Sequence, residues 1–159
     1  MSTLDLKAHL EATTRNICRR IVNDLKAVPA DQQNVSPGGC ARPPLNVVAE
    51  CAMVNGFIAD FLTTNEVPAR PDAETRDRFL ASFDTEEKTL TYFEEQAEKL
   101  YAAFQTLETE TLGETTDALF GRPMTRLAVA EMPAMHMSYH DGQLNYVHSL
   151  CGDAQMHWG

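Results

Sequence analysis

Two histidines near the C-terminus, His136 and His140, are the residues whose type and spacing most directly suggest chemistry. They lie in a stretch from Thr125 to Gly152 that is typical of one long helix. At about 3.6 residues per turn, a spacing of four residues places both imidazoles on one face of that helix. Two imidazoles in this arrangement can offer two nitrogen ligands to one metal ion. The residues between them are Met-Ser-Tyr, so the glutamate of an HExxH zinc motif is missing.

The face that carries the two histidines is otherwise mostly apolar. Its other members are Met132, Tyr139, Gln143, Val147 and Leu150. A polar group on a buried face destabilises the fold unless it is paired or bound to a metal. Two interpretations follow: the histidines are metal ligands, or they are core residues hydrogen-bonded to neighbouring helices.

The residues around the pair are expected to play supporting parts. Tyr139 is expected to pack in the core rather than to act as an acid, and Asp141 to lie at the surface. Gln143, nearly one turn after His140, is expected to bond to a ligand histidine or to the backbone of the first helix. His148 lies about 80° around the helix from His140, which predicts a surface position or a dimer contact.

Apolar residues recur at helical spacing in four segments, and no segment shows sustained alternation of apolar and polar residues. The predicted helices cover about 3–27, 44–62, 84–108 and 125–151. The connections between them are long, and the one over residues 63–83 is expected to hold a short helix from about Asp72 to Phe83. These features predict an all-α chain, a single four-helix-bundle domain over residues 1–159, with room for a crossover connection.

The second predicted helix carries polar residues beside its broad apolar face. Glu50 lies on the side of Val47 and Val54, and Asn55 lies on the side of Cys51. A carboxylate that borders a core face is either a boundary residue or a ligand, and periodicity alone leaves both interpretations open.

The composition limits the classes of partner. The chain has 13 basic and 23 acidic residues and a net charge of −10, which argues against binding to nucleic-acid phosphates. We find no run of about 18 apolar residues, so we expect no membrane span. The N-terminal segment lacks the basic start and apolar block of a secretory signal, so we expect a cytoplasmic protein.

The sequence HMSYHDGQLNYVHSL, followed by CGD, is similar to the last helix of the DinB/YfiT-like family. That helix typically has the pattern HxxxH-x-GQ, followed by apolar residues and a glycine. His136, His140, Gly142 and Gln143 match the pattern. The order and lengths of the predicted helices also agree, so the resemblance extends over essentially the whole chain. It implies a four-helix bundle of DinB/YfiT-like type with a metal site between helices.

The resemblance also implies a third ligand on the second helix, where the family usually has a histidine in a context such as W-S-x-x-E-x-x-x-H. That position falls on Glu50. The implied ligand set is therefore Glu50, His136 and His140 around a divalent ion, with zinc, nickel, manganese and iron not distinguished. Cys51, if the helix is rotated by one residue, and Asn55, one turn further on, are alternatives. The family's tryptophan is missing as well, since the only tryptophan is Trp158.

Two functions follow as expectations. The resemblance implies a metal-dependent enzyme, a thiol-dependent S-transferase or a hydrolase, acting on a small molecule such as a low-molecular-weight thiol or an electrophile. Family members commonly form homodimers, which is expected here as well. The alternative is a non-enzymatic bundle with a degenerate metal site, serving as a binding or stress-linked interaction protein.

Overall fold

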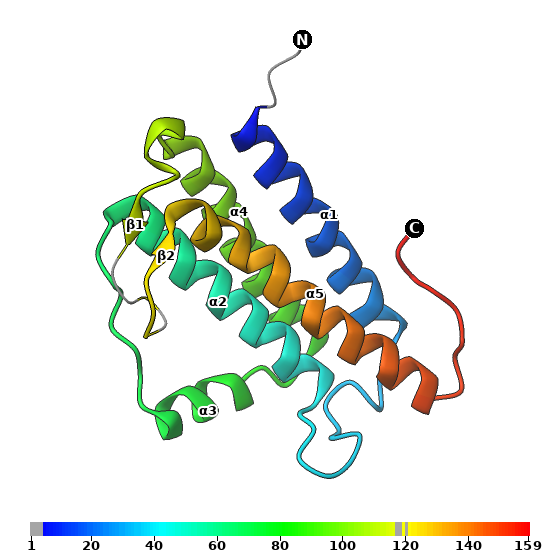
Figure 1. The fold of residues 1–159 in the computed structure, drawn as a ribbon. Helices are drawn as coiled ribbons and strands as arrows, with labels where there is room; N and C mark the ends of the chain where they lie inside the picture. Colours follow the sequence, from blue (N-terminus) through cyan, green and yellow to red (C-terminus); the bar gives the residue numbers. More distant parts are fainter. Residues whose placement is uncertain (1–4, 117–118, 120) are drawn as a thin grey trace.

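The computed structural model describes residues 5–116, 119 and 121–159 (Figure 1). Helices make up most of it: α1 (Leu6–Ala27), α2 (Pro44–Thr64), α3 (Ala73–Ala81), α4 (Glu86–Thr106) and α5 (Arg126–Leu150). A 3-10 turn, η1 (Thr109–Thr111), precedes a small antiparallel pair of strands, β1 (Thr115–Thr116) and β2 (Met124–Thr125). The prediction of an all-α chain is confirmed, although the two short strands were not predicted.

The helices begin at residues that satisfy their first backbone amides. The side chains of Asp5, Thr85 and Thr125 accept hydrogen bonds from the amides three residues on in α1, α4 and α5. Pro44 occupies the first turn of α2, where a missing N–H has no cost. The predicted start at 84 was two residues early because Thr85, not Asp84, caps α4. Residues 3 and 4 of the first predicted helix lie outside the described residues.

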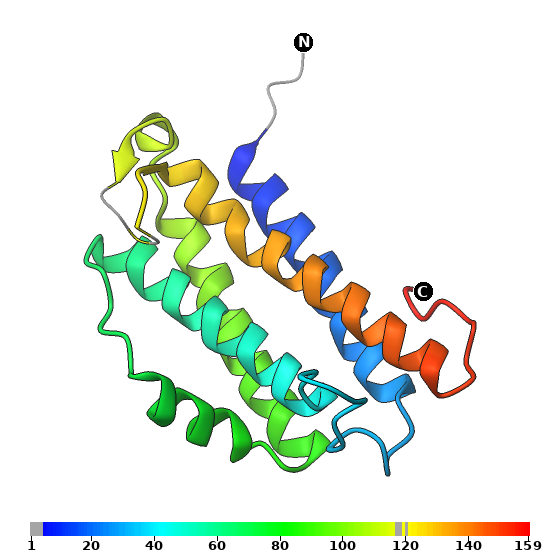
Figure 2. The same ribbon diagram turned by 60° about the horizontal axis from the view of Figure 1, so that its bottom comes forward.

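The four long helices α1, α2, α4 and α5 lie side by side around a common apolar interior, and α3 runs outside them along α2 (Figures 1 and 2). α5 packs against both α1 and α2, and α4 packs against the same two helices. α1 and α2 contact each other only sparsely, although they follow each other in the chain. The long α1–α2 connection therefore crosses the end of the structure diagonally.

The core is filled by large apolar side chains that are almost completely buried. Those of greatest volume include Ile21, Leu25, Phe61, Phe93, Leu100 and Phe104. In the described part of the chain, α2 alone is long and apolar enough to cross a membrane by length and composition, which the count of apolar residues did not anticipate. About two thirds of that window is buried inside the fold, and a core helix passes the same test.

α5 has two buried sides because it lies between α1 and α2, and three expectations for it were wrong for that reason. Asp141 and His148, expected at the surface, are each 1% exposed on the side facing α1. Tyr139, expected in the core, is 66% exposed. A single apolar face was the wrong description of this helix, since its buried surface covers two interfaces.

The interface between α1 and α5 holds a network of charged side chains. Arg20 forms an ion pair with Asp141, and Asn145 Nδ2 donates to Asp24 Oδ2 at 2.6 Å. The Arg20 guanidinium also lies 3.5 Å from the ring centroid of Trp158, so the C-terminal segment covers this network. Burial and the neighbouring Asp24 raise the pKa of Asp141 to about 6, against the opposing effect of Arg20.

Arg20→Ala should lower the free energy of unfolding by about 3 kcal/mol at pH 7, because it leaves two buried carboxyl groups without their cation. The loss should be smaller at pH 4. Without Arg20 the pKa of Asp141 rises further above its unfolded value of 3.8. The native state then binds more protons than the unfolded chain, and stability falls as the pH rises from about 4 to beyond 6. Urea unfolding at several pH values measures this.

Arg78→Ala is the matched control, since Arg78 pairs with Glu74 at an exposed site. It should change stability by at most about 0.5 kcal/mol. An Arg20→Ala loss that is the same at pH 4 and pH 7 would show that the two carboxyl groups do not depend on this guanidinium.

Candidate metal centre

The candidate site lies where α2 packs against α5. α2 supplies Glu50 and Cys51, and α5 supplies His136 and His140. The loop of residues 28–43 contributes Arg42, which bonds to Glu50 of α2. This loop is anchored by the buried Gln33, whose side-chain amide donates to the carbonyl oxygens of Leu25 and Val28.

The two histidines converge as their spacing predicted. His136 Nε2 lies 3.2 Å from His140 Nε2, with the rings nearly perpendicular at 76°. His140 is 3% exposed and His136 is half-buried. Ligands about 2.0–2.2 Å from one metal ion lie roughly 2.8–3.6 Å from each other in octahedral or tetrahedral geometry, so the nitrogen separation suits a shared ion.

Gln143 orients His140. Its Oε1 lies 2.7 Å from His140 Nδ1, so the ring donates Nδ1–H to the amide oxygen. A neutral His140 in this tautomer directs an unprotonated Nε2 at His136 and Glu50. Metal-binding histidines are usually held by such a bond from the other ring nitrogen. The expectation that Gln143 bonds to a ligand histidine is met.

Glu50 lies against His140 and Arg42. Its Oε2 is 3.2 Å from His140 Nε2, and it forms an ion pair with Arg42. Burial alone would raise the pKa of Glu50, but the hydrogen bond from His140 when its Nε2 carries a proton, together with the hydrogen bond and charge of the Arg42 guanidinium, outweighs burial and lowers the pKa to about 2. The carboxyl group is therefore ionised at neutral pH and available as an oxygen donor.

Cys51 approaches the histidines from inside the core. Its Sγ and one nitrogen of each histidine lie within 4.8 Å of one another, a group that can hold a metal ion. Cys51 is fully buried, and burial raises the pKa of its thiol well above the ordinary value. Asn55, the other alternative, donates its amide to Met137 Sδ at 3.5 Å. The structure thus brings Cys51 close to both histidines, whereas Glu50 contacts His140.

Lone pairs on the ring nitrogens of the histidines and on the carboxylate of Glu50 lie close together in this cluster. Burial and the neighbouring His140 lower the pKa of His136 to about 4, so this ring is neutral at pH 7. When His140 donates Nδ1–H to Gln143, its Nε2 faces both the ionised Glu50 and the ring nitrogen of His136. The lone pairs of His140, His136 and Glu50 repel one another here, and only a proton or a metal cation between them offsets this repulsion. The donor set therefore fits a divalent ion.

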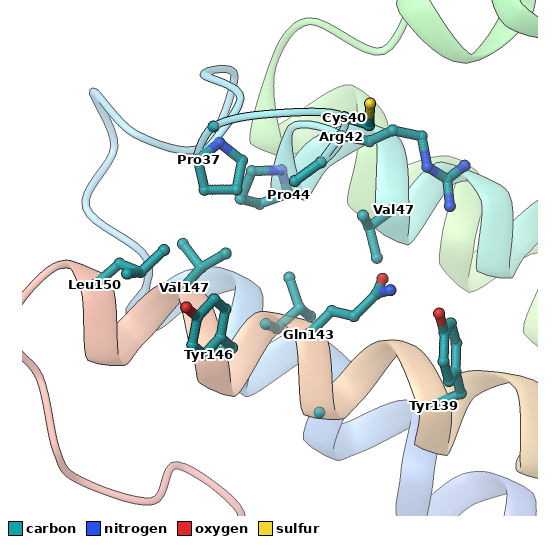
Figure 3. Close-up of a pocket in the computed structure, with 14 residues that line it drawn as sticks. Pro37, Cys40, Arg42, Pro44, Val47, Tyr139, Gln143, Tyr146, Val147 and Leu150 are labelled. Atoms are coloured by element: carbon teal, nitrogen blue, oxygen red, sulfur yellow. The ribbon is translucent and has the colours of Figure 1, made fainter.

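Two cavities border the cluster. The larger, about 580 Å³, lies between the 28–43 loop and α5 and is lined by Arg42, Tyr139 and Gln143 at one end (Figure 3). The smaller, about 240 Å³, is lined by Glu50, Phe57 and Arg76 among others. Small molecules thus have two routes towards the donors.

Sequence reasoning missed Arg42. The pattern of the loop gives no sign of it, because its role depends on the loop folding back over α2, eight residues before Glu50. Gly142, part of the family-like pattern, has no steric need for glycine: a Cβ there would meet no atom within 4 Å.

A scan against protein-family models found no match, and a search of curated proteins found none either. The chemistry assigned to the cluster therefore depends on the geometry of its own side chains.

Gln143→Leu should weaken divalent-metal binding by about 10- to 100-fold, because His140 loses the bond that fixes its tautomer. The thermal stability of the metal-free protein should change little, since Gln143 is only partly buried. Calorimetric titration of the metal-free protein with Zn²⁺ measures the affinity. Gln155→Leu, at an exposed position in the C-terminal segment, is the control and should bind as the parent does. Equal affinities in Gln143→Leu and the parent would contradict the role given to Gln143.

Proposed function

We propose that the protein is a metal-dependent enzyme that holds a divalent ion between α2 and α5 and catalyses thiol transfer to an electrophile or a hydrolysis. One observation carries the proposal: the 3.2 Å approach of His136 Nε2 and His140 Nε2, with an ionised carboxylate 3.2 Å from the second nitrogen. Two imidazoles beside a carboxylate are donors suited to zinc, nickel, manganese or iron.

Glu50 is the third donor in this proposal, with His136 and His140 as the other two. Its carboxyl is ionised, partly exposed and next to a cavity, so it can move to an ion at little cost. Cys51 would first have to lose a proton inside the core, where the pKa of its thiol is raised. Two imidazoles and one carboxylate leave coordination positions for water or substrate.

The reaction class follows from the charge of the ion. A bound divalent cation lowers the pKa of a bound water or thiol enough to give a nucleophile near neutral pH. The residues of the chain hold the donors in place: Gln143 orients His140, and Arg42 lies beside Glu50. The cavities next to the donors are of a size for small molecules.

The four long helices and the HxxxH-x-GQ pattern support a bundle of the DinB/YfiT-like type as part of this proposal. A low-molecular-weight thiol and an electrophile are the substrates that this likeness suggests. Assembly as a homodimer and a cytoplasmic location belong to the same proposal.

Protein purified without a histidine tag, stripped with a chelator and titrated with Zn²⁺, Ni²⁺ or Mn²⁺ should bind one ion per chain. The melting temperature should rise with metal, because an ion that binds only the native state stabilises it by about 2.7 kcal/mol at a hundredfold excess over Kd. His140→Ala should abolish both effects. The control is His9→Ala, at an exposed site. No binding of any of the three ions would contradict the proposal.

Glu50→Gln and Cys51→Ala separate the two candidate third donors. With Co²⁺ as the probe, Glu50→Gln should weaken binding, whereas Cys51→Ala should leave it within about threefold of the parent. An intense thiolate-to-cobalt charge-transfer band that disappears in Cys51→Ala would instead assign the third position to Cys51.

A second candidate, a non-enzymatic helical protein with a degenerate metal site, is favoured by one contact. Glu50 already has the Arg42 guanidinium and His140 as partners, so the cluster can persist without an ion. In that case His136→Ala would change stability but not the affinity for any ligand.

A further inference from the structure

The groove between the 28–43 loop and α5 has a polar end and an apolar end. Arg42, Gln143 and Tyr139 lie towards one end, and Pro37, Val147 and Leu150 lie towards the other (Figure 3). Residues 139 to 150 of α5 span about 16 Å at 1.5 Å per residue. With a volume of about 580 Å³, the groove is in the range that suits a small ligand rather than a protein segment.

The apolar end exposes side chains that a folded protein usually buries. Tyr146 is 65% exposed and Leu150 is 54% exposed, and both lie on the α5 face beneath the 28–43 loop. Prolines and aliphatic side chains there form a mostly apolar rim. A hydrocarbon chain that covers this surface would remove it from water.

The polar end adjoins the donor cluster through two shared residues. Gln143 lines the groove and bonds to His140, and Arg42 lines the groove and pairs with Glu50. Arg42 is a cation in a chain of net charge −10, and its side chain is 39% exposed. A guanidinium in this position favours a carboxylate, which it can bind through two parallel hydrogen bonds.

We propose that this groove binds an amphipathic carboxylate, with its anionic head at Arg42 and Gln143 and its hydrocarbon chain along α5 towards Leu150. This proposal rests on the proposed function in one respect: it takes this ligand to be the class of substrate on which the metal centre acts. Charge and apolar surface alone decide binding, so the groove takes up the ligand in the metal-free protein as well.

A bound ion and a bound carboxylate assist each other in this arrangement. A cation bound to Glu50 offsets the charge of the carboxylate, so coordination weakens the pairing of Glu50 with Arg42. The guanidinium is then available to the head of the ligand. By reciprocity, the carboxylate also strengthens metal binding by the same factor.

Calorimetric and NMR titration of the full chain with octanoate, decanoate and dodecanoate tests the proposal, with octylammonium and octanol as head-group controls. One carboxylate should bind per protein chain, and its affinity should increase with the length of the hydrocarbon. Binding should shift the resonances of Tyr146 and Leu150. Arg42→Gln should weaken decanoate at least about tenfold and leave octanol unchanged.

The double variant Tyr146→Gln/Leu150→Gln should weaken decanoate more than octanoate, since the longer chain covers more of the apolar end. Met135→Gln is the matched control, because Met135 is 63% exposed on the same helix but lies outside the groove. It should bind decanoate as the parent does. All three positions are exposed, so the fold should tolerate the substitutions.

Each titration is repeated with Zn²⁺, which separates this proposal from the proposed function. Carboxylate binding without metal binding would overturn the proposed function alone, and metal binding without carboxylate binding would overturn this one. Equal affinity for octylammonium and decanoate would also overturn it. So would a dimer that dissociates in the double variant, because a second copy of the chain would then occupy the groove.

Discussion

Ionisable side chains on α5 are buried against two different helices, and an arginine from another part of the chain lies at each interface. His140 faces α2, where Glu50 is paired with Arg42. Asp141, the next residue, faces α1, where it is paired with Arg20 beside Asp24. Burial of these groups is tolerable only with such partners. The position of α5 between α1 and α2 therefore determines both the candidate site and the charged network behind it.

The site and the fold depend on the same packing. The α1–α2 connection crosses the end of the structure, and its return over α2 places Arg42 beside Glu50 and forms one wall of the groove. Gln33 anchors that connection to the end of α1. A change in the loop would thus alter both the charge at Glu50 and the entrance to the donors, without touching a histidine.

The sequence predicted the parts of the fold that depend on local signals. Apolar spacing, caps and prolines located the long helices to within a few residues, and the four-residue spacing of His136 and His140 predicted their convergence. The positions of Asp141, His148 and Tyr139 were predicted wrongly, because one apolar face was assumed for a helix that packs on two neighbours. Arg42 was missed because its contact with Glu50 depends on the path of a loop. The choice between Glu50 and Cys51 as third donor stays a prediction, since these adjacent residues of α2 both lie close to His140.

The central claim is that His136 and His140 share one metal ion. Anomalous diffraction from crystals of the zinc-loaded protein tests it most directly. The account predicts a single anomalous peak at the α2–α5 interface, about 2.0–2.1 Å from the Nε2 atoms of both histidines and within coordination distance of Glu50. A peak bound elsewhere, or no peak between these two nitrogens at saturating zinc, would contradict it.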